Sequence, residues 1–539
     1  MQIEKAIKLN LNKLIRDYKN HDECIMDFFD YKPFPESYKQ RAEDLKEREF
    51  PRHELADVLM EANGKWGAPQ ATLAHIEQLR TKEATVVIGG QQAGLLTGPF
   101  YTVNKIISLI QMANIQEKEL GTPVIPVFWI AGEDHDFDEI NHVYIPKDNK
   151  MDKHKLSVDT NKQSISAIEN DLVKSKKWVD DVFAALPETE RTKKMYEAAL
   201  DILQKSDTYV DFMAMLLFLI FKDEGVILID SADPAIRRLE SDYFDKIIRN
   251  RDAIATSVVS AKMKLAQLGY NAQLDPELED GNLFLENDGE RVLLQINELE
   301  QWTGKQNEVT LITDELLRIA NENPERLSNN VVTRPIMQEF LFPTLAFIGG
   351  NGEIAYWSAL KGAFHAVGLK VPPVVPRLSF TFVDSLTAKK LLRANLEAEK
   401  VIQAGTGGAR MNWLKNQAGP PLDLMKEQLK NTISDAHAPL REAAFAIRDD
   451  LGALAEQNMK KIEREVEFLH DKMMRAIELR YATGLADFDS LQINLQPFGG
   501  LQERIWNPIF LVNSQGASFI RDLASKELSF KEDHYIINI

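Results

Sequence analysis

The clearest hydrophobic pattern in the chain lies between residues 84 and 142. Residues 84–88 are apolar except for Thr85, residues 103–113 carry apolar side chains along one helical face, and residues 123–130 are again apolar. The order of buried strand, loop, helix and buried strand is that of a βαβ unit, whose two strands are parallel. Loops that leave parallel strands at their carboxyl ends lie at one edge of the sheet, where α/β enzymes bind ligands. The pattern therefore predicts an α/β fold with a crevice at that edge.

Further apolar runs continue this sheet. They cover residues 225–229, 344–348 and 371–375, and a helix is expected from about 354 to 367. Between them, residues 284–294 form two strand-like runs around Asp288-Gly289, which predicts a β-hairpin. The sheet should therefore be interrupted by insertions and continue to about residue 383.

After residue 383 the sequence pattern changes from strand-like runs to helical ones. One helical run is expected over residues 384–404, and helix returns at 422 after a turn rich in glycine and proline. From 440 to 482 the apolar positions alternate steps of three and four residues, with one stutter, as in a coiled coil. Pro439 should kink this arm, because proline removes a helical hydrogen bond. The arm is expected to pair within the chain or between two subunits.

These patterns divide the chain into eight segments. They are a helical N-terminal region (1–80), the first part of the parallel core (81–150), a helical insertion (151–215), a core strand (216–240), a small α+β insertion with the hairpin (241–330), the last part of the core (331–383), a coiled-coil domain (384–485) and a C-terminal tail (486–539).

Composition narrows the class of protein. The formal charge of -18 argues against a nucleic-acid partner, because phosphate-binding surfaces are basic. The single cysteine, Cys24, excludes an intramolecular disulfide and fits a reducing cytoplasm. The apolar run over 212–221 has about half the ~20 residues needed to span a bilayer, and the N-terminus has no signal-like apolar region. We therefore expect a cytoplasmic protein without membrane segments.

The first candidate site is the glycine-rich stretch that follows residues 84–88. It matches neither the dinucleotide fingerprint nor the P-loop, but a glycine turn before a helix offers free backbone N–H groups to an anion. A simple tight turn is the alternative. The candidate ligand-binding residues here are Gly89, Gly90, Gln91, Gln92, Gly94, Thr97, Gly98 and Lys105.

The second candidate site is the polar stretch after residue 130. It contains Glu133, Asp134, His135, Asp136, Asn141 and His142. Carboxylates recognise an ammonium group and histidine titrates near neutral pH, so general acid–base chemistry or amine binding is expected. A solvated loop with Asp136 or Asp138 capping a short helix is one alternative. A metal site formed by His135, Asp136 and His142 is another, although the spacing between the histidines is not a standard one.

A third group of residues should complete the crevice. Gly350, Glu353 and Tyr356 follow the run at 344–348, and Arg334, Arg377 and Ser379 lie near other expected strand ends. Arginine suits the binding of a carboxylate or a phosphate.

The motifs at residues 89–99, 132–142, 350–357 and 501–504 together resemble the bacillithiol biosynthesis cysteine-adding enzyme family (BshC), over essentially the whole chain. The resemblance implies a Rossmann-like core with inserted connecting motifs and a dimerising coiled-coil domain. It also implies a ligase that adds L-cysteine to glucosaminyl-malate, the last step of bacillithiol synthesis. The HIGH and KMSKS signatures of related cysteine ligases are absent, so the way the cysteine carboxyl is activated stays open.

On this interpretation, residues 133–136 and His142 carry the chemistry, and Arg334 or Arg377 binds the malate carboxylates. The expected cofactor is ATP or ADP, with Mg²⁺ entering only with the nucleotide. The tail residues expected to bind it are Gln502, Arg504, Trp506 and Asn507. The expected partners are the two substrates and a second copy of the chain through the coiled coil. The alternatives are a metal-dependent sugar-amide hydrolase and a non-enzymatic coiled-coil interaction protein.

Overall fold

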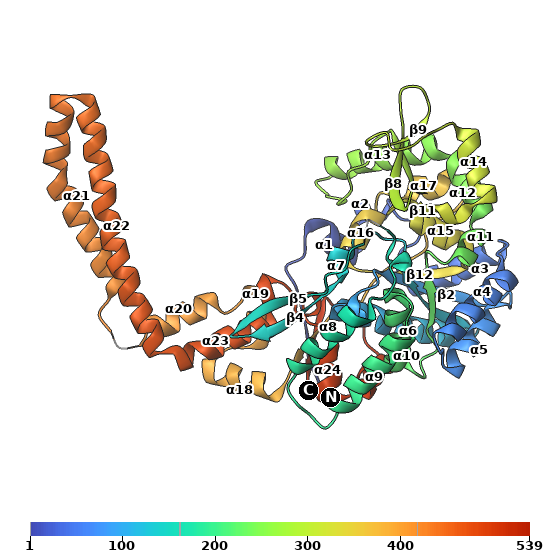
Figure 1. Ribbon diagram of the computed structural model, residues 1–539, viewed down its shortest axis with the longest axis horizontal. Coiled ribbons are helices and arrows are strands. Elements are labelled where there is room, and N and C mark those ends of the chain that lie inside the picture. Colours follow the sequence, from blue (N-terminus) through green and yellow to red (C-terminus); the bar gives the residue numbers. More distant parts are fainter. Residues whose placement is uncertain (1, 161–162, 418) are drawn as a thin grey trace. The chain divides into compact units, whose positions relative to one another are not determined.

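A computed structural model describes residues 2–160, 163–417 and 419–539, which form two structural units (Figure 1). The first unit contains the residues up to 145, residues 151–382 and residues 501–539. The second contains residues 146–150 and 383–500. Within the described residues, no helix is both long enough and apolar enough to cross a membrane.

The first unit is built on a five-stranded sheet in the order β13-β12-β2-β3-β6, in which neighbouring strands are parallel. The strands are β2 (Thr85–Gln91), β3 (Val124–Ile130), β6 (Ile227–Asp230), β12 (Thr344–Gly349) and β13 (Val374–Pro376). Successive side chains enter opposite faces: Val87 belongs to one core, whereas Val86 and Ile88 belong to the other. The predicted α/β class and the parallel βαβ unit are confirmed.

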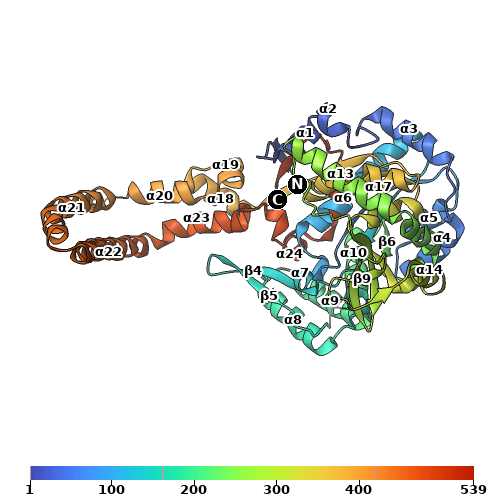
Figure 2. The same ribbon diagram turned by 90° about the horizontal axis from the view of Figure 1, so that it is seen from above.

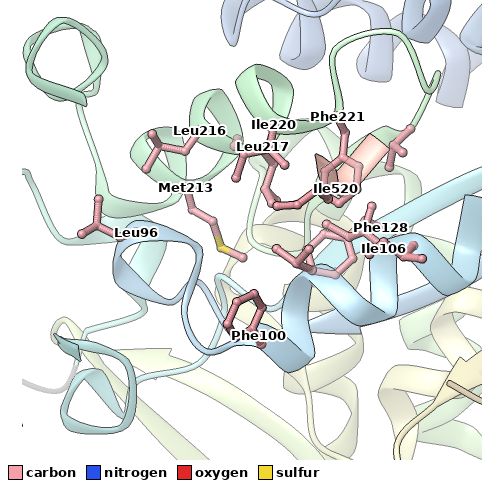
Figure 3. Packing of buried hydrophobic residues seen from close by; sticks show 14 of the residues in the cluster. Leu96, Phe100, Ile106, Phe128, Met213, Leu216, Leu217, Ile220, Phe221 and Ile520 are labelled. Atoms are coloured by element: carbon pink, nitrogen blue, oxygen red, sulfur yellow. The ribbon is translucent and has the colours of Figure 1, made fainter. Parts of the chain in front are cut away.

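Helix α6 (Phe100–Leu120) connects β2 to β3 and is buried from Thr102 to Ala113. It is therefore not the amphipathic helix expected from the sequence. The reason is that further helices cover it: α25 (Ala517–Ala524) packs against α6, and α10 (Tyr209–Phe221) packs against α25 and against residues 95–97 just before α6. Figure 3 shows part of this core, in which the side chain of Met213 of α10 points towards Phe100 of α6.

Three local predictions near the sheet are wrong. Gly89 and Gly90 belong to strand β2 rather than to the loop after it. Their lack of a side chain serves close strand packing, because a Cβ on Gly90 would lie 2.7 Å from the Trp129 carbonyl oxygen. The expected helix over 354–367 is two helices, α16 (Asn351–Trp357) and α17 (Lys361–Ala366), because i→i+3 hydrogen bonds tighten and end the first at residues 358–360. The strand expected over 371–375 begins only at Val374.

The chain ends also differ from the prediction, since the N-terminal region opens with a strand. Strand β1 (Gln2–Ile7) pairs antiparallel with β15 (His534–Asn538), which lies next to β14 (Phe380–Val383). The helices that follow β1 are α1 (Lys13–Lys19), α2 (Glu23–Met26), α3 (Pro35–Lys46), α4 (Arg52–Lys65) and α5 (Gln70–Leu79). The tail before β15 contains η5 (Gln502–Arg504), α24 (Ile509–Gln515) and α25.

The insertions carry the remaining elements of the first unit. The first begins with a hairpin rather than a helix, β4 (His142–Lys147) and β5 (Lys150–Lys155), before α8 (Leu172–Ala184) and α9 (Thr192–Lys205). The second contains α11 (Pro234–Leu239), α12 (Ser241–Arg249), α13 (Arg251–Gln267), β7 (Asp280–Asn287), β8 (Glu290–Ile296), β9 (Trp302–Gly304), β10 (Thr310–Leu311), α14 (Thr313–Glu322), β11 (Leu327–Asn329) and α15 (Thr333–Leu341). The hairpin expected around Asp288-Gly289 is β7–β8, with positive φ at both turn residues.

The second unit consists largely of helices. They are α18 (Ser385–Ala394), α19 (Ala398–Ala404), α20 (Gly407–Lys415), α21 (Leu422–Ile447), α22 (Asp449–Arg480) and α23 (Ala482–Leu495). Helices α21 and α22 lie side by side (Figures 1 and 2) and are joined by the Lys430–Glu467 ion pair.

Two expectations for these helices are wrong. The run over 384–404 is broken, because Asn395 adopts a left-handed conformation that ends α18. The arm expected over 440–482 turns back at the extended residue Arg448, whereas Pro439 lies inside α21. Part of the apolar stripe is therefore covered within the chain.

Candidate active site

A pocket of ≈ 380 Å³ lies at the carboxyl edge of the parallel sheet. Gly90 and Gln91 at the end of β2, Ala131 after β3 and Gly350 after β12 contribute to its wall. Strand order reverses between β2 and β12, since the chain proceeds from β2 to β3 on one side and from β12 to β13 on the other. Such a reversal opens a crevice in which α/β proteins bind their ligands. The pocket therefore lies where the sequence pattern predicts it.

The structure brings eleven of the predicted site residues into the wall of this pocket. They are Gly90, Gln91, Gln92, Lys105, Asp134, Arg334, Gly350, Glu353, Tyr356, Arg377 and Arg504. Tyr101, Gln338 and Asn351 also line it and were not predicted. Asn351 directly follows Gly350 after β12, and this position is a signal that could have identified it, whereas Tyr101 in the first turn of α6 and Gln338 in α15 have no such signal.

Three of the four cationic side chains of the pocket are paired with carboxylates. Lys105 is buried, and its Nζ donates to Glu353 Oε2 and to the Gly90 carbonyl oxygen, both at 2.5 Å. Glu353 Oε2 also accepts from the backbone N–H of Gly350 at 2.7 Å, which satisfies the first turn of α16. Burial lowers the pKa of Lys105, although the charge of Glu353 opposes this.

Arg377 forms a bidentate ion pair with Glu503, with Nη1–Oε2 and Nη2–Oε1 distances of 2.9 and 2.6 Å. Glu503 is buried and also accepts from Asn104 Nδ2 at 2.7 Å. Burial alone would raise the pKa of Glu503, but the charge of Arg377 lowers it. This pairing ties the C-terminal tail to the pocket and occupies the guanidinium that was expected to bind a substrate carboxylate.

Glu133 does not belong to the wall of the pocket. Its carboxylate accepts from Arg334 Nε at 2.6 Å and pairs with Arg237, which also binds Glu240. Burial by itself would raise the pKa of Glu133, but the charges of Arg334 and Arg237 lower it to about 2. A carboxylate that stays ionised between two arginines positions Arg334, so the geometry does not support proton transfer by Glu133.

Arg504 differs from the other three cations. It follows Glu503 in η5, is exposed and lines the pocket. Among the described residues, no carboxylate forms an ion pair with its guanidinium. Arg504 is therefore the pocket cation available for a carboxylate or phosphate of a ligand.

The glycine-rich and acidic loops meet through Gln92, as the predicted crevice requires. Its Nε2 donates to Asp134 Oδ2 at 2.8 Å and to Glu139 Oε2 at 2.7 Å. Burial alone would raise the pKa of Asp134, but the hydrogen bond from Gln92 and nearby arginines lower it. His135 is half-buried beside Phe284 and Arg291 of the inserted sheet, with 3.4 Å between its Nδ1 and Arg291 Nη1. Asp134 and His135 thus lie at the rim between the core and the insertion.

The loop after β2 holds an uncommon backbone. Leu96, Thr97 and Gly98 have φ values of 48°, 73° and 72°. Asn507 Nδ2 donates to the carbonyl oxygens of Leu95, Leu96 and Gly98 at 3.4, 3.0 and 2.8 Å. Non-glycine residues with positive φ cost free energy and persist where surrounding contacts enforce them. Asn507 therefore supports this loop, in which Thr97 is buried.

The metal alternative finds no support in the geometry. Within the described residues, no three His, Cys, Asp or Glu side chains gather closely enough to hold a metal ion. Asp136 is exposed, and its side chain does not cap α7 (Phe137–Ile140). Asn141 is buried and donates to Asp138 at 3.1 Å. His142 is half-buried, and burial lowers its pKa to about 4. The alternative ligand set of His135, Asp136 and His142 is thus not formed among the described residues.

Three further predicted residues lie outside the pocket. Ser379 Oγ is buried and forms a hydrogen bond of 2.7 Å with His534 Nδ1, so it joins β14 to β15. Gln502 accepts from the backbone N–H of Phe382 at 2.8 Å and donates to its carbonyl oxygen at 3.0 Å. Trp506 packs edge-on against Phe510. These contacts are structural, so of the four tail residues only Arg504 faces the pocket.

Comparisons with known proteins agree with this architecture. Residues 1–378 match the model of the bacillithiol biosynthesis BshC N-terminal Rossmann-like domain, and residues 380–539 match that of the BshC C-terminal coiled-coil domain. A protein of Oceanobacillus iheyensis named "Putative cysteine ligase BshC" is 42% identical over 98% of both chains. Proteins of the same name from Bacillus cereus (strain B4264) and Bacillus thuringiensis (strain Al Hakam) are 40% and 39% identical over 99% of both chains.

Proposed function

Because this chain belongs to the bacillithiol biosynthesis BshC family, we propose that it is a cysteine ligase that forms an amide bond between L-cysteine and the amine of glucosaminyl-malate. The observation that carries the proposal is the pocket at the strand-order reversal. Among the described residues of its wall, Arg504 is a cation without a carboxylate partner, and Asp134 is a carboxylate that forms no ion pair with a lysine or an arginine. An anionic substrate that also carries an amine would be complementary to both groups.

The reaction requires a neutral amine nitrogen and an electrophilic carboxyl carbon. Asp134, which stays ionised at neutral pH, binds the ammonium form of the sugar amine, and His135 beside it accepts the proton. The nitrogen then attacks the cysteine carboxyl carbon, the bond to the leaving group breaks, and the amide forms. Arg504 binds the malate carboxylates or a phosphate during this step. Arg334, Arg377 and Lys105, which are paired with carboxylates, maintain the shape and charge of the wall.

Activation of the cysteine carboxyl is proposed to use ATP, which supplies a phosphoryl or adenylyl leaving group. Of the tail residues expected to bind a nucleotide, Arg504 fits a phosphate by charge and access. Gln502 and Asn507 are engaged in buried hydrogen bonds. Omission of ATP should therefore abolish product formation, whereas product formed without ATP would contradict this route.

The proposal is tested by measuring product from cysteine, glucosaminyl-malate and ATP in wild type and matched variants. Asp134→Asn and His135→Ala should each lower kcat/KM by about 10²-fold or more, as expected when acid–base catalysis is removed. Arg504→Gln should mainly raise KM for the substrate whose anionic group Arg504 binds, either glucosaminyl-malate or ATP. The control is Arg318→Gln, because Arg318 is equally exposed but lies on α14, outside the pocket wall. Unchanged turnover in both Asp134→Asn and His135→Ala would move the chemistry to another site.

Assembly as a homodimer through α21 and α22 is part of the proposal. Its support is the number of large apolar side chains that these helices leave exposed. They are Leu424, Met425, Leu429, Leu440, Phe445, Ile447, Leu454, Phe468, Leu469, Met473 and Leu479. Large apolar side chains that are left in water favour association. Replacing Val466 and Leu469 by aspartate should yield monomers on a sizing column coupled to light scattering. A wild-type chain that elutes as a 61.2 kDa monomer at micromolar concentration would contradict the dimer.

A further inference from the structure

A second, much smaller cavity adjoins the active-site pocket. It has a volume of ≈ 20 Å³, and Gln92 and Tyr101 line both spaces. A cavity needs about 10–15 Å³ of this volume to hold one water molecule. The small cavity therefore admits a group of one or two heavy atoms and excludes a longer side chain.

The wall of the small cavity is mostly apolar. Ile140, Val143 and Ile505 contribute aliphatic surface, and Gly94 and Gly98 contribute backbone. Neither glycine can readily be replaced: a Cβ on Gly94 would lie 2.6 Å from Gly98 Cα, and Gly98 has positive φ. The strained loop held by Asn507 thus creates this space. A polarisable, uncharged group is favoured in it over a charged one.

A histidine and a carboxylate are among the residues that line the same cavity. His142 lines it, and its Nδ1 is buried without a hydrogen-bond partner among the described residues. Because burial lowers the pKa of His142 to about 4, the ring is neutral near pH 7 and adds no charge. Glu139 also lines the cavity and uses Oε2 to accept from Gln92. Its exposed carboxylate is suited to an ammonium group at the junction of the two spaces.

We propose that this small cavity binds the side chain of the amino-acid substrate, with its α-ammonium at Glu139 and its carboxyl group directed into the larger pocket. The proposal rests on the proposed ligase function. A CH₂–SH group matches the volume and the apolar wall, whereas one more methylene exceeds the space. The cavity wall is then what selects cysteine from other amino acids, and Ile505 and Val143 are specificity-determining residues.

The test compares cysteine with homocysteine as substrates, because they differ by one methylene. Wild type should prefer cysteine by at least about 10-fold in kcat/KM, the usual effect of one methylene in a tight pocket. Ile505→Ala enlarges the wall and should reduce this preference by about 10-fold through better use of homocysteine. The control is Ile319→Ala, because Ile319 is similarly half-buried but lies on α14, outside both spaces.

A second variant tests the assignment by making the cavity smaller. Val143→Ile fills the space and should raise KM for cysteine about 10-fold while KM for glucosaminyl-malate stays unchanged. Thermal unfolding of each variant shows whether it is folded. If wild type makes product but neither variant changes the preference or the cysteine KM, the cavity assignment is overturned and the ligase function stands. If wild type makes no product from cysteine, the proposed function itself fails.

Discussion

Replacing Glu133 by glutamine distinguishes a structural carboxylate from a catalytic one. The substitution keeps the shape of the side chain but removes the charge that lies between Arg237 and Arg334. Glu133 is buried, so both guanidinium groups lose their charged partner, and Arg237, which is itself buried, cannot exchange that partner for water. The variant should therefore be less stable than wild type.

The size of the effect follows from the pKa of the carboxyl group. The difference between about 2 in the folded protein and the ordinary value of 4.5 corresponds to about 3 kcal/mol of unfolding free energy near neutral pH. A lowered pKa gives stability that is fully present above about pH 4.5 and is lost as the pH falls towards 2. The contribution should fall to less than half by about pH 3, and with it the difference between wild type and variant.

Thermal unfolding measures this difference. For a unit of about 400 residues, about 3 kcal/mol lowers Tm by about 4 °C. The control is Glu298→Gln, because Glu298 is exposed and forms no ion pair among the described residues; its Tm should match wild type. A Glu133→Gln variant with wild-type Tm and no ligase activity would refute the reasoning, since Glu133 would then act on the substrate directly.

Three other outcomes follow from the geometry. Asn507→Ala removes the two amide N–H groups that donate to the loop carbonyl oxygens and should cost about 2 kcal/mol, with faster hydrogen exchange at residues 95–98; unchanged exchange would show that the loop keeps its conformation without Asn507. Gly90→Ala should destabilise the fold by about 1–3 kcal/mol in denaturant unfolding, whereas Gly64→Ala, where a Cβ meets nothing within 4 Å, should not. His142→Gln should lose less stability than wild type between about pH 6.5 and 4, because the lowered pKa of His142 makes the folded state bind fewer protons there; parallel Tm–pH curves would contradict this.

The sheet could be predicted from sequence because its signal is local. Residues 84–88 and 123–130 are apolar runs of strand length, and their order with a helix between them defines a parallel pair. Local pattern also explains the error at Gly89 and Gly90. Glycines after an apolar run read as a turn, whereas here they allow the backbones of neighbouring strands to approach closely.

The pairing of the charged side chains in the pocket could not be predicted, because each ion pair joins residues that are far apart in the sequence. Glu353 is 248 residues from Lys105, and Glu503 is 126 residues from Arg377. Lys105 and Arg377 are expected to bind a ligand because of their residue type and their position near strand ends, and neither feature shows which carboxylate pairs with them. Likewise, the pairing of α21 with α22 depends on a reversal at Arg448, which no glycine or proline marks. The location of the site was therefore readable from local pattern, but which of its side chains remain available to a ligand was not.

The most direct test of the account is the mass of the product formed by the purified protein. With L-cysteine, glucosaminyl-malate and ATP, liquid chromatography with mass spectrometry should detect a species equal to the two substrates less one water. Fragmentation should locate the cysteinyl group on the sugar nitrogen, and Asp134→Asn should form this species at least about 10²-fold more slowly. If wild type yields no such species while thermal unfolding shows it folded, or if Asp134→Asn yields it at the wild-type rate, the assignment of amide ligation to this pocket is contradicted.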